Sequence, residues 1–135
     1  MTRSPLRFLP KPLAVLCFAA AFASCSTTSV DDMRAAPADA TYTSAKPPAA
    51  LSECVVAAFN DSARGFEAIQ FDGAKAYANG PRYTVAALTN YPTYILDITP
   101  SKAGGSVIEE RTTLRAGFAV KGYLPRFRAL TSGCL

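Results

Sequence analysis

Hydrophobic positions recur at a helical spacing in two parts of the chain. In residues 51–59 they fall at i, i+3, i+4, i+7 and i+8, one apolar stripe formed by Leu51, Cys54, Val55, Ala58 and Phe59. A proline pair precedes this stretch, as suits a first helical turn. Near the C-terminus, Tyr123, Phe127, Leu130 and Cys134 repeat the spacing. The pattern therefore predicts an N-terminal and a C-terminal helix.

Between these helices, apolar and polar positions alternate with a period of two, which is typical of half-buried strands. The clearest alternation lies in residues 93–99, and turn signals indicate further strands at 67–71, 74–77, 82–89 and 106–113. Asp72-Gly73 is expected to close a hairpin between the first two of these. We expect an α+β domain with a small antiparallel sheet of three to five strands and both helices on one face.

The N-terminus carries a different pattern. Three basic residues precede an apolar run of about a dozen residues at 12–23, whereas a membrane-spanning helix needs about 20. A basic segment followed by a short apolar run and small residues is typical of a secretory signal.

The four residues Phe22-Ala23-Ser24-Cys25 resemble the lipobox of bacterial lipoproteins, with phenylalanine where leucine is usual. The resemblance implies that Cys25 receives a diacylglycerol and that signal peptidase II removes residues 1–24. Ser26, where aspartate would favour the inner membrane, implies an outer-membrane, periplasm-facing anchor. Cys17 fits the motif less well because bulky Leu16 precedes it.

An ordinary secretory cleavage is the alternative. Ala21-Phe22-Ala23 is also an acceptable site, and cutting there would release a chain that starts at Ser24. That cleavage would leave Cys25 as an odd, exposed thiol in an oxidising compartment.

Residues 25–47 contain few large apolar side chains, too few to offset the cost of ordering the backbone. We expect this segment to be a lipidated cysteine followed by a flexible tether, and residues 48–135 to form the single domain. A domain of that size often needs a covalent staple.

Cysteine parity supports such a staple. If Cys17 is removed and Cys25 is lipidated, Cys54 and Cys134 remain, and both lie on the apolar faces of predicted helices. An even pair in a small exported domain indicates a disulfide, with two buried free thiols as the alternative.

The net charge of +4 belongs mostly to the signal segment. Loss of Arg3, Arg7 and Lys11 leaves 11 basic residues against 10 acidic ones, so the remaining charge is about +1 and gives little support to nucleic-acid binding.

Candidate chemistry is sparse. The chain has no histidine, the commonest general base and metal ligand. Ser101-Lys102 lies in a glycine-rich turn, and Glu109-Glu110 should face opposite sides of a strand. If the hairpin turns at Lys102, Asp97, Glu109 and Arg111 share a solvent-facing side of the sheet. We expect no enzyme, no metal and no cofactor.

One basic stretch stands out in residues 111–128, which contain no acid and interleave aromatic side chains with the bases Arg111, Arg115, Lys121, Arg126 and Arg128. Such a stretch can contact anionic lipid or cell-wall polymer. The alternative is that these bases solvate the last helix while the aromatic side chains fill the core.

These patterns predict a membrane-anchored envelope lipoprotein, non-enzymatic, that acts as a periplasm-facing binding or accessory module for another envelope component. Binding of an anionic surface through residues 111–128 is the alternative, and a small envelope enzyme comes third.

Overall fold

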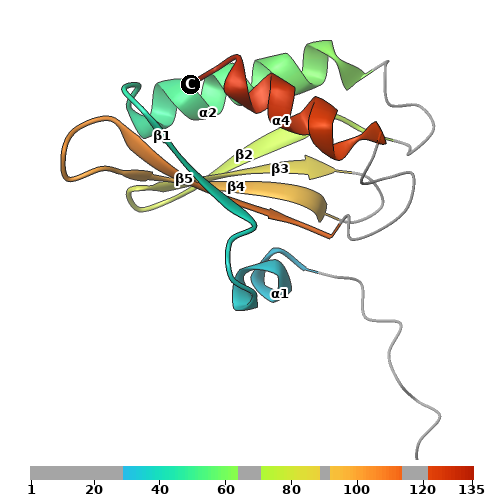
Figure 1. Ribbon diagram of the computed structural model, residues 1–135, viewed down its shortest axis with the longest axis horizontal. Helices are drawn as coiled ribbons and strands as arrows, with labels where there is room; N and C mark the ends of the chain where they lie inside the picture. The colour runs from blue at the N-terminus through green and yellow to red at the C-terminus, as the bar shows by residue number, and fades with distance from the viewer. Residues whose placement is uncertain (1–28, 64–70, 89–91, 114–121) are drawn as a thin grey trace, which may run out of the picture.

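The fold is α+β: a five-stranded antiparallel sheet carries two helices on one face and a short helix on the other (Figure 1). The computed structural model describes residues 29–63, 71–88, 92–113 and 122–135. In chain order, the described elements are α1 (Val30–Ala35), β1 (Ala40–Ser44), α2 (Pro48–Asp61), β2 (Ala74–Asn79), β3 (Arg82–Leu88), β4 (Pro92–Pro100), β5 (Ser106–Thr112) and α4 (Leu124–Ser132).

The sheet has the order β1-β5-β4-β3-β2, with every pair antiparallel. Strands β2 to β5 form a meander. Strand β1 pairs with β5 at one edge of the sheet, and α2 connects β1 to β2 at the opposite edge. The predicted strands at 74–77, 82–89, 93–99 and 106–113 are confirmed as β2 to β5, within two residues at each end.

Helices α2 and α4 confirm the two predicted helices and lie side by side over the sheet (Figure 1). Their aromatic side chains meet in the main core, where the rings of Phe59 and Phe127 stack at 5.3 Å and that of Tyr94 from β4 lies 5.2 Å from Phe127. Such ring pairs add to the free energy gained by burying apolar area.

The predicted disulfide is present. Cys54 of α2 is bonded to Cys134, two residues beyond the end of α4, with Cα atoms 5.9 Å apart. The bond joins the two helices that cover the main core.

The expectation of a flexible tether up to Pro47 is wrong for the residues from Ser29 onward. Ser29 begins α1 with a capping box, in which its hydroxyl and backbone exchange hydrogen bonds with Asp32. Strand β1 then pairs with β5 over five residues, Ala40 to Ser44. The composition of this segment does not reveal these elements, because they are stabilised by contacts with residues distant in sequence. These contacts are the backbone pairing of β1 with β5 and the burial of Met33 against the sheet.

The predicted hairpin at Asp72-Gly73 is also wrong. Backbone hydrogen bonds from the Asp72 N–H to the Leu88 carbonyl, and from the Leu88 N–H to the Gly73 carbonyl, continue the pairing of β2 with β3. The chain therefore continues along β3 at these residues and does not reverse there. β2 instead turns at Gly80 into β3, and most of the strand expected at 67–71 lies outside the described residues.

No helix within the described ranges has the length and apolar character required to cross a membrane.

Candidate functional site

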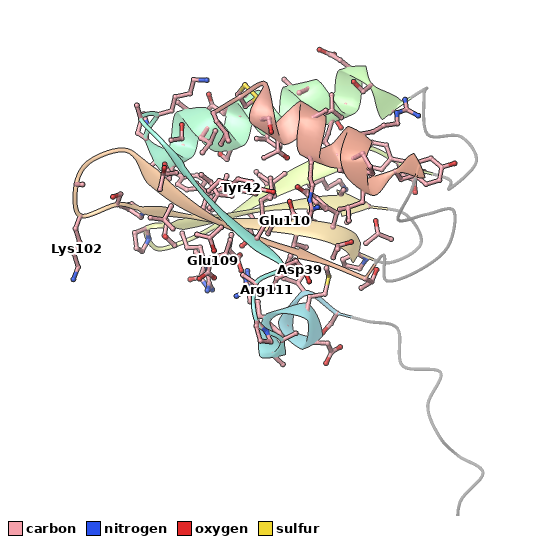
Figure 2. All side chains as sticks on the ribbon, in the orientation of Figure 1. Asp39, Tyr42, Lys102, Glu109, Glu110 and Arg111 are labelled. Atoms are coloured by element: carbon pink, nitrogen blue, oxygen red, sulfur yellow. A yellow bond between two sulfur atoms is a disulfide. The ribbon has the colours of Figure 1, made fainter. Side chains whose placement is uncertain are left out.

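Two buried carboxylates organise the polar interior, one on each face of the sheet. Glu110 of β5 points toward α2 and α4 and has no exposed surface, whereas Asp97 of β4 points toward α1 and is 4% exposed. Glu109 and Glu110 face opposite sides, as expected from their adjacency in a strand. Figure 2 shows Glu110 beside Tyr42 on the helix-covered side, with Glu109 and Arg111 on the other.

Glu110 accepts hydrogen bonds from three side chains. One carboxylate oxygen accepts from the hydroxyls of Tyr42 and Tyr94, each at 2.8 Å. The other accepts from Arg128 of α4, at 2.9 Å from Nε and 2.7 Å from a terminal nitrogen. The cluster thus links β1, β4, β5 and α4 through a single side chain.

The tyrosines and the arginine of this cluster hold their protons more tightly than usual. Burial, and next the Glu110 carboxylate, raise the pKa of Tyr42. Burial likewise raises the pKa of Tyr94, and Glu110 raises it further. The hydrogen bond to Glu110 raises the pKa of Arg128. The arrangement holds Glu110 in place and leaves neither oxygen for another partner.

Asp97 is held by α1. Its carboxylate accepts from Arg34 at two atoms, with distances of 2.9 and 2.7 Å, and from the Thr84 hydroxyl at 2.6 Å. Arg111 approaches the same carboxylate at 3.5 Å while it binds Glu109 at 2.9 Å. Burial raises the pKa of Asp97, but the bonds from Arg34 and Thr84 outweigh it and hold that pKa below its usual value.

The sequence placed Asp97, Glu109 and Arg111 on one face of the sheet, and they do share it. The face at Asp97 is covered, however, so the expectation of a solvent-facing position is wrong for this carboxylate. The reason is that Met33 of α1 packs on Ala86 and Ile95, which brings Arg34 over Asp97.

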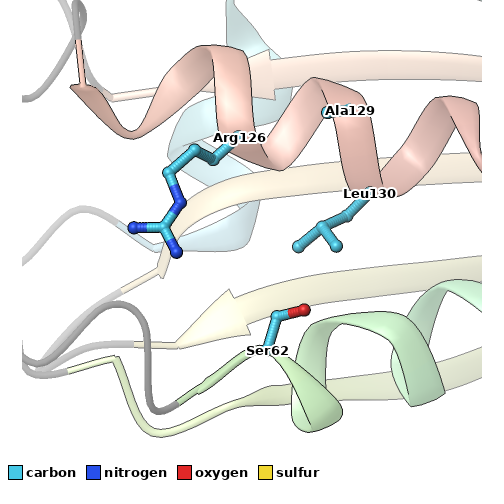
Figure 3. Close-up of a pocket in the computed structure, with 4 residues that line it drawn as sticks. All are labelled: Ser62, Arg126, Ala129 and Leu130. Carbon is cyan, nitrogen blue, oxygen red and sulfur yellow. The ribbon is translucent and has the colours of Figure 1, made fainter.

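The basic residues expected to form one anionic-binding stretch are not brought together. Arg111 lies on the α1 side with Asp97 and Glu109, and Arg128 lies on the α4 side with Glu110. Arg126 lines an open pocket of about 180 Å³ between α2 and α4, together with Ser62, Ala129 and Leu130 (Figure 3). Arg115 and Lys121 lie outside the described residues.

Other candidate groups are dispersed. Lys102 projects from the tip of the β4–β5 turn, away from the body of the domain (Figure 2), and nothing places Ser101 as a nucleophile beside it. Within the described ranges, no three Asp, Glu or Cys side chains converge on a point that could hold a metal ion. Cys25, the expected lipidation site, lies outside these ranges.

Strand β2 provides a different kind of feature, an exposed sheet edge. Its residues from Lys75 to Asn79 are exposed, and Tyr77, at 51%, is the most exposed large hydrophobic side chain of the described chain. Of the described residues, only β3 pairs with β2. The edge thus offers both backbone groups and an aromatic ring to solvent.

Arg82 lies next to this edge and was missed from the sequence. Its Nε is buried and has no hydrogen-bond partner, the one such side-chain atom among the described residues. It begins β3 directly opposite Asn79. The network of Arg34 was missed as well, although the Ser29-x-x-Asp32 capping box was a readable helix signal.

Comparison of the chain with models of known protein families, with characterised proteins and with solved structures gives no match.

Proposed function

We propose that this chain is a lipid-anchored envelope protein whose periplasm-facing domain binds another envelope component. The observation that carries the binding role is the exposed edge of β2, with Tyr77 half exposed beside it. An open sheet edge offers unpaired backbone groups to another chain, and an aromatic ring beside them adds contact area.

The disulfide supports the export that this role requires. Cys54 and Cys134 pair with each other, which removes both from the set of candidate lipid acceptors. Structural disulfides form and persist in oxidising compartments such as the bacterial periplasm. Cys25, the lipobox cysteine, is not needed for this disulfide and is left to accept the lipid in our proposal.

The start of α1 changes the geometry of the proposed anchor. Ser29 caps α1 only four residues after Cys25. Four residues span at most about 14 Å when fully extended. A domain lipidated at Cys25 is thus held directly at the membrane surface, with α1 and its side of the sheet nearest the lipid, and does not swing on a long tether.

The polar interior supports a binding role over chemistry. Glu110 and Asp97, the two buried carboxylates described above, have both oxygens occupied by arginine, tyrosine or threonine donors. A general base needs an accessible lone pair near its substrate.

Anchoring is tested by fatty-acid labelling and membrane fractionation of the full-length chain in a bacterial host. We expect the unaltered protein to be labelled and membrane-bound, and Cys25→Ala to be unlabelled and released. Cys17→Ala is the matched control, because it removes the neighbouring cysteine and leaves the lipobox intact. A labelled Cys25→Ala protein, or an unaltered protein that begins at Ser24, would contradict the proposal.

Binding is tested in the same cells by photo-crosslinking from single surface positions, including Tyr77 on the edge strand and Arg126 in the pocket. We expect a discrete adduct from at least one position. Failure at every position with the protein well expressed would overturn the binding role.

A further inference from the structure

The backbone of β2 presents a row of unused hydrogen-bonding groups on its outer side. The N–H of Ala74 points away from β3, since it donates to the Asn60 side chain at 2.8 Å. N–H directions alternate along a strand, so the N–H groups of Ala76 and Ala78 point to the same outer side. Both residues are exposed, and their small side chains allow another backbone to approach closely.

The side chains beside this edge carry positive charge, of which only that of Arg82 interacts electrostatically with a buried acid, Asp97. Lys75 and Tyr77 share one face of β2, and Arg82 of β3 lies on the same face, because Asn79, its partner in the register, is two residues from Tyr77. Lys75 and Arg82 form no ion pair in the described chain. The nearest buried acid, Asp97, is already held by Arg34 and Thr84.

We propose that the outer edge of β2 is a strand-addition site, which binds an extended segment of a partner protein whose carboxylate side chain pairs with Arg82 and Lys75. Backbone hydrogen bonds to Ala76 and Ala78 supply the register, and the acidic side chain supplies the specificity. The partner's carboxylate adds a charge-assisted contact to the part of the Arg82 side chain that remains accessible. This inference rests on the proposed binding role and names its site and the chemistry of the partner.

Charge favours a partner segment over a second copy of this chain. Two β2 strands paired about Tyr77 would place Lys75 opposite Asn79 of the other copy, and β2 of that copy would bring no carboxylate to Lys75 or Arg82. The positive charge would remain unanswered across the new interface. An acidic segment removes that penalty and forms the same backbone hydrogen bonds.

The experiment is site-specific photo-crosslinking of the full-length, membrane-anchored protein in cells, from Asn79 at the end of the edge strand. Ala76→Pro removes the outward N–H and leaves the pairing with β3 intact, because proline is tolerated where the N–H faces away from the sheet. Ala76→Ser, which keeps the N–H, is its matched control. Arg82→Gln tests the charge in a variant whose backbone is unaltered.

We expect one adduct whose crosslinked segment contains an Asp or Glu. Its yield should fall about threefold to tenfold in Ala76→Pro, the effect of losing one backbone hydrogen bond, and about tenfold in Arg82→Gln, where a charge-assisted bond is lost. Ala76→Ser should stay within about twofold of the unaltered protein. Thermal unfolding of each purified variant, unchanged within a few degrees, confirms that the fold is intact.

Three results would overturn the strand-addition site. They are an adduct between two copies of this chain, an adduct that both Arg82→Gln and Ala76→Pro leave unchanged, and an adduct that forms from Arg126 and not from Asn79. The last of these leaves the binding role standing at a different surface. Absence of any adduct from Asn79, from Arg126 and from every other surface position tested overturns the binding role as well.

Discussion

Gly104 and Gly105 form the turn between β4 and β5, and both have a positive φ, at 93° and 72°. A Cβ at Gly105 would lie 2.1 Å from the carbonyl oxygen of Ser44, whereas one at Gly104 would meet nothing within 4 Å. The two positions therefore share the backbone strain of a left-handed residue and differ in the space around them.

We expect Gly105→Ala to lower the free energy of unfolding by about 1–3 kcal/mol more than Gly104→Ala, because only the former forces β1 away from the turn. Urea unfolding followed by circular dichroism measures the difference. Equal losses in the two variants would show that the close approach of Ser44 to the turn is not maintained in solution.

Glu110 and Glu109 give the second comparison at this scale. Removing the charge of Glu110 leaves Arg128, whose side chain is 42% exposed, and two tyrosine hydroxyls without a charged acceptor, and the loss of hydrogen bonds to a charged group costs about 1.5–3 kcal/mol. We expect that loss in the free energy of unfolding of Glu110→Gln. Glu109→Gln, the adjacent residue with a side chain 49% exposed, should change it by less than about 1 kcal/mol. Similar losses for both would contradict the buried cluster.

At the scale of elements, the carboxylate of Asp97 on β4 binds Arg34 and so holds α1 against the sheet. Arg34 binds Asp97 at two atoms, and Met33 adds apolar contact with Ala86 and Ile95. Because the pKa of Asp97 is lowered in the folded protein, its contribution is complete above the unfolded value of about 3.9. It is lost as the pH falls through the lowered folded value.

We therefore expect Asp97→Asn to cost about 3 kcal/mol of unfolding free energy at pH 7, and that deficit to shrink as the pH falls below about 4. Thermal unfolding of both proteins between pH 7 and pH 2 measures the trend. Asp31→Asn is the control, since its side chain is 92% exposed at the far end of the same arginine. A deficit that stays constant to pH 2 would contradict the role of the ionised Asp97.

The elements that could be predicted are those with a local signal. The apolar stripe of α2 and the alternation of β4 are written in neighbouring residues, so the α+β fold and the Cys54–Cys134 bond were both foreseen. Strand β1 has no such signal, because β5, the strand it pairs with among the described residues, is more than 60 residues away in sequence. Its sequence, with one threonine on either side of a single tyrosine, is also typical of an unstructured linker. Only the pairing with β5 identifies it as a strand.

The polar networks were predictable only in part. Alternation along β5 separated Glu109 from Glu110 correctly, but it could not show that one end of the same face is covered. That depends on α1 and on the reach of Arg34, a long side chain from a segment expected to be unstructured. Arg82 lies in a strand that was foreseen, yet its lack of a partner is a property of its surroundings in three dimensions.

At the scale of the whole molecule, strands β2 to β5 are stabilised by contacts between sequence neighbours, whereas β1, α2 and α4 are stabilised by contacts between distant parts of the chain. Strands β2 to β5 pair with sequence neighbours, while β1, α2 and α4 are joined across nearly the full length of the domain. Ser44 donates to the carbonyl of Leu135, Lys46 donates to that of Cys134, and the disulfide spans a sequence separation of 80. The chain ends of the domain are therefore held together by both covalent and polar contacts.

Removal of the disulfide tests how far the fold depends on this closure. In the chain-entropy model, a bridge across about 80 residues contributes roughly 4 kcal/mol by restricting the unfolded chain. We expect the double variant Cys54→Ser, Cys134→Ser to lose about that much unfolding free energy and about 15 °C or more in Tm. Because the bridge acts chiefly on the unfolded state, the variant should keep its helix and strand content below its lower Tm, as circular dichroism would show. A variant that loses that content at low temperature would show instead that the bridge holds α2 against α4 in the folded state, and that the aromatic core between them cannot form without it.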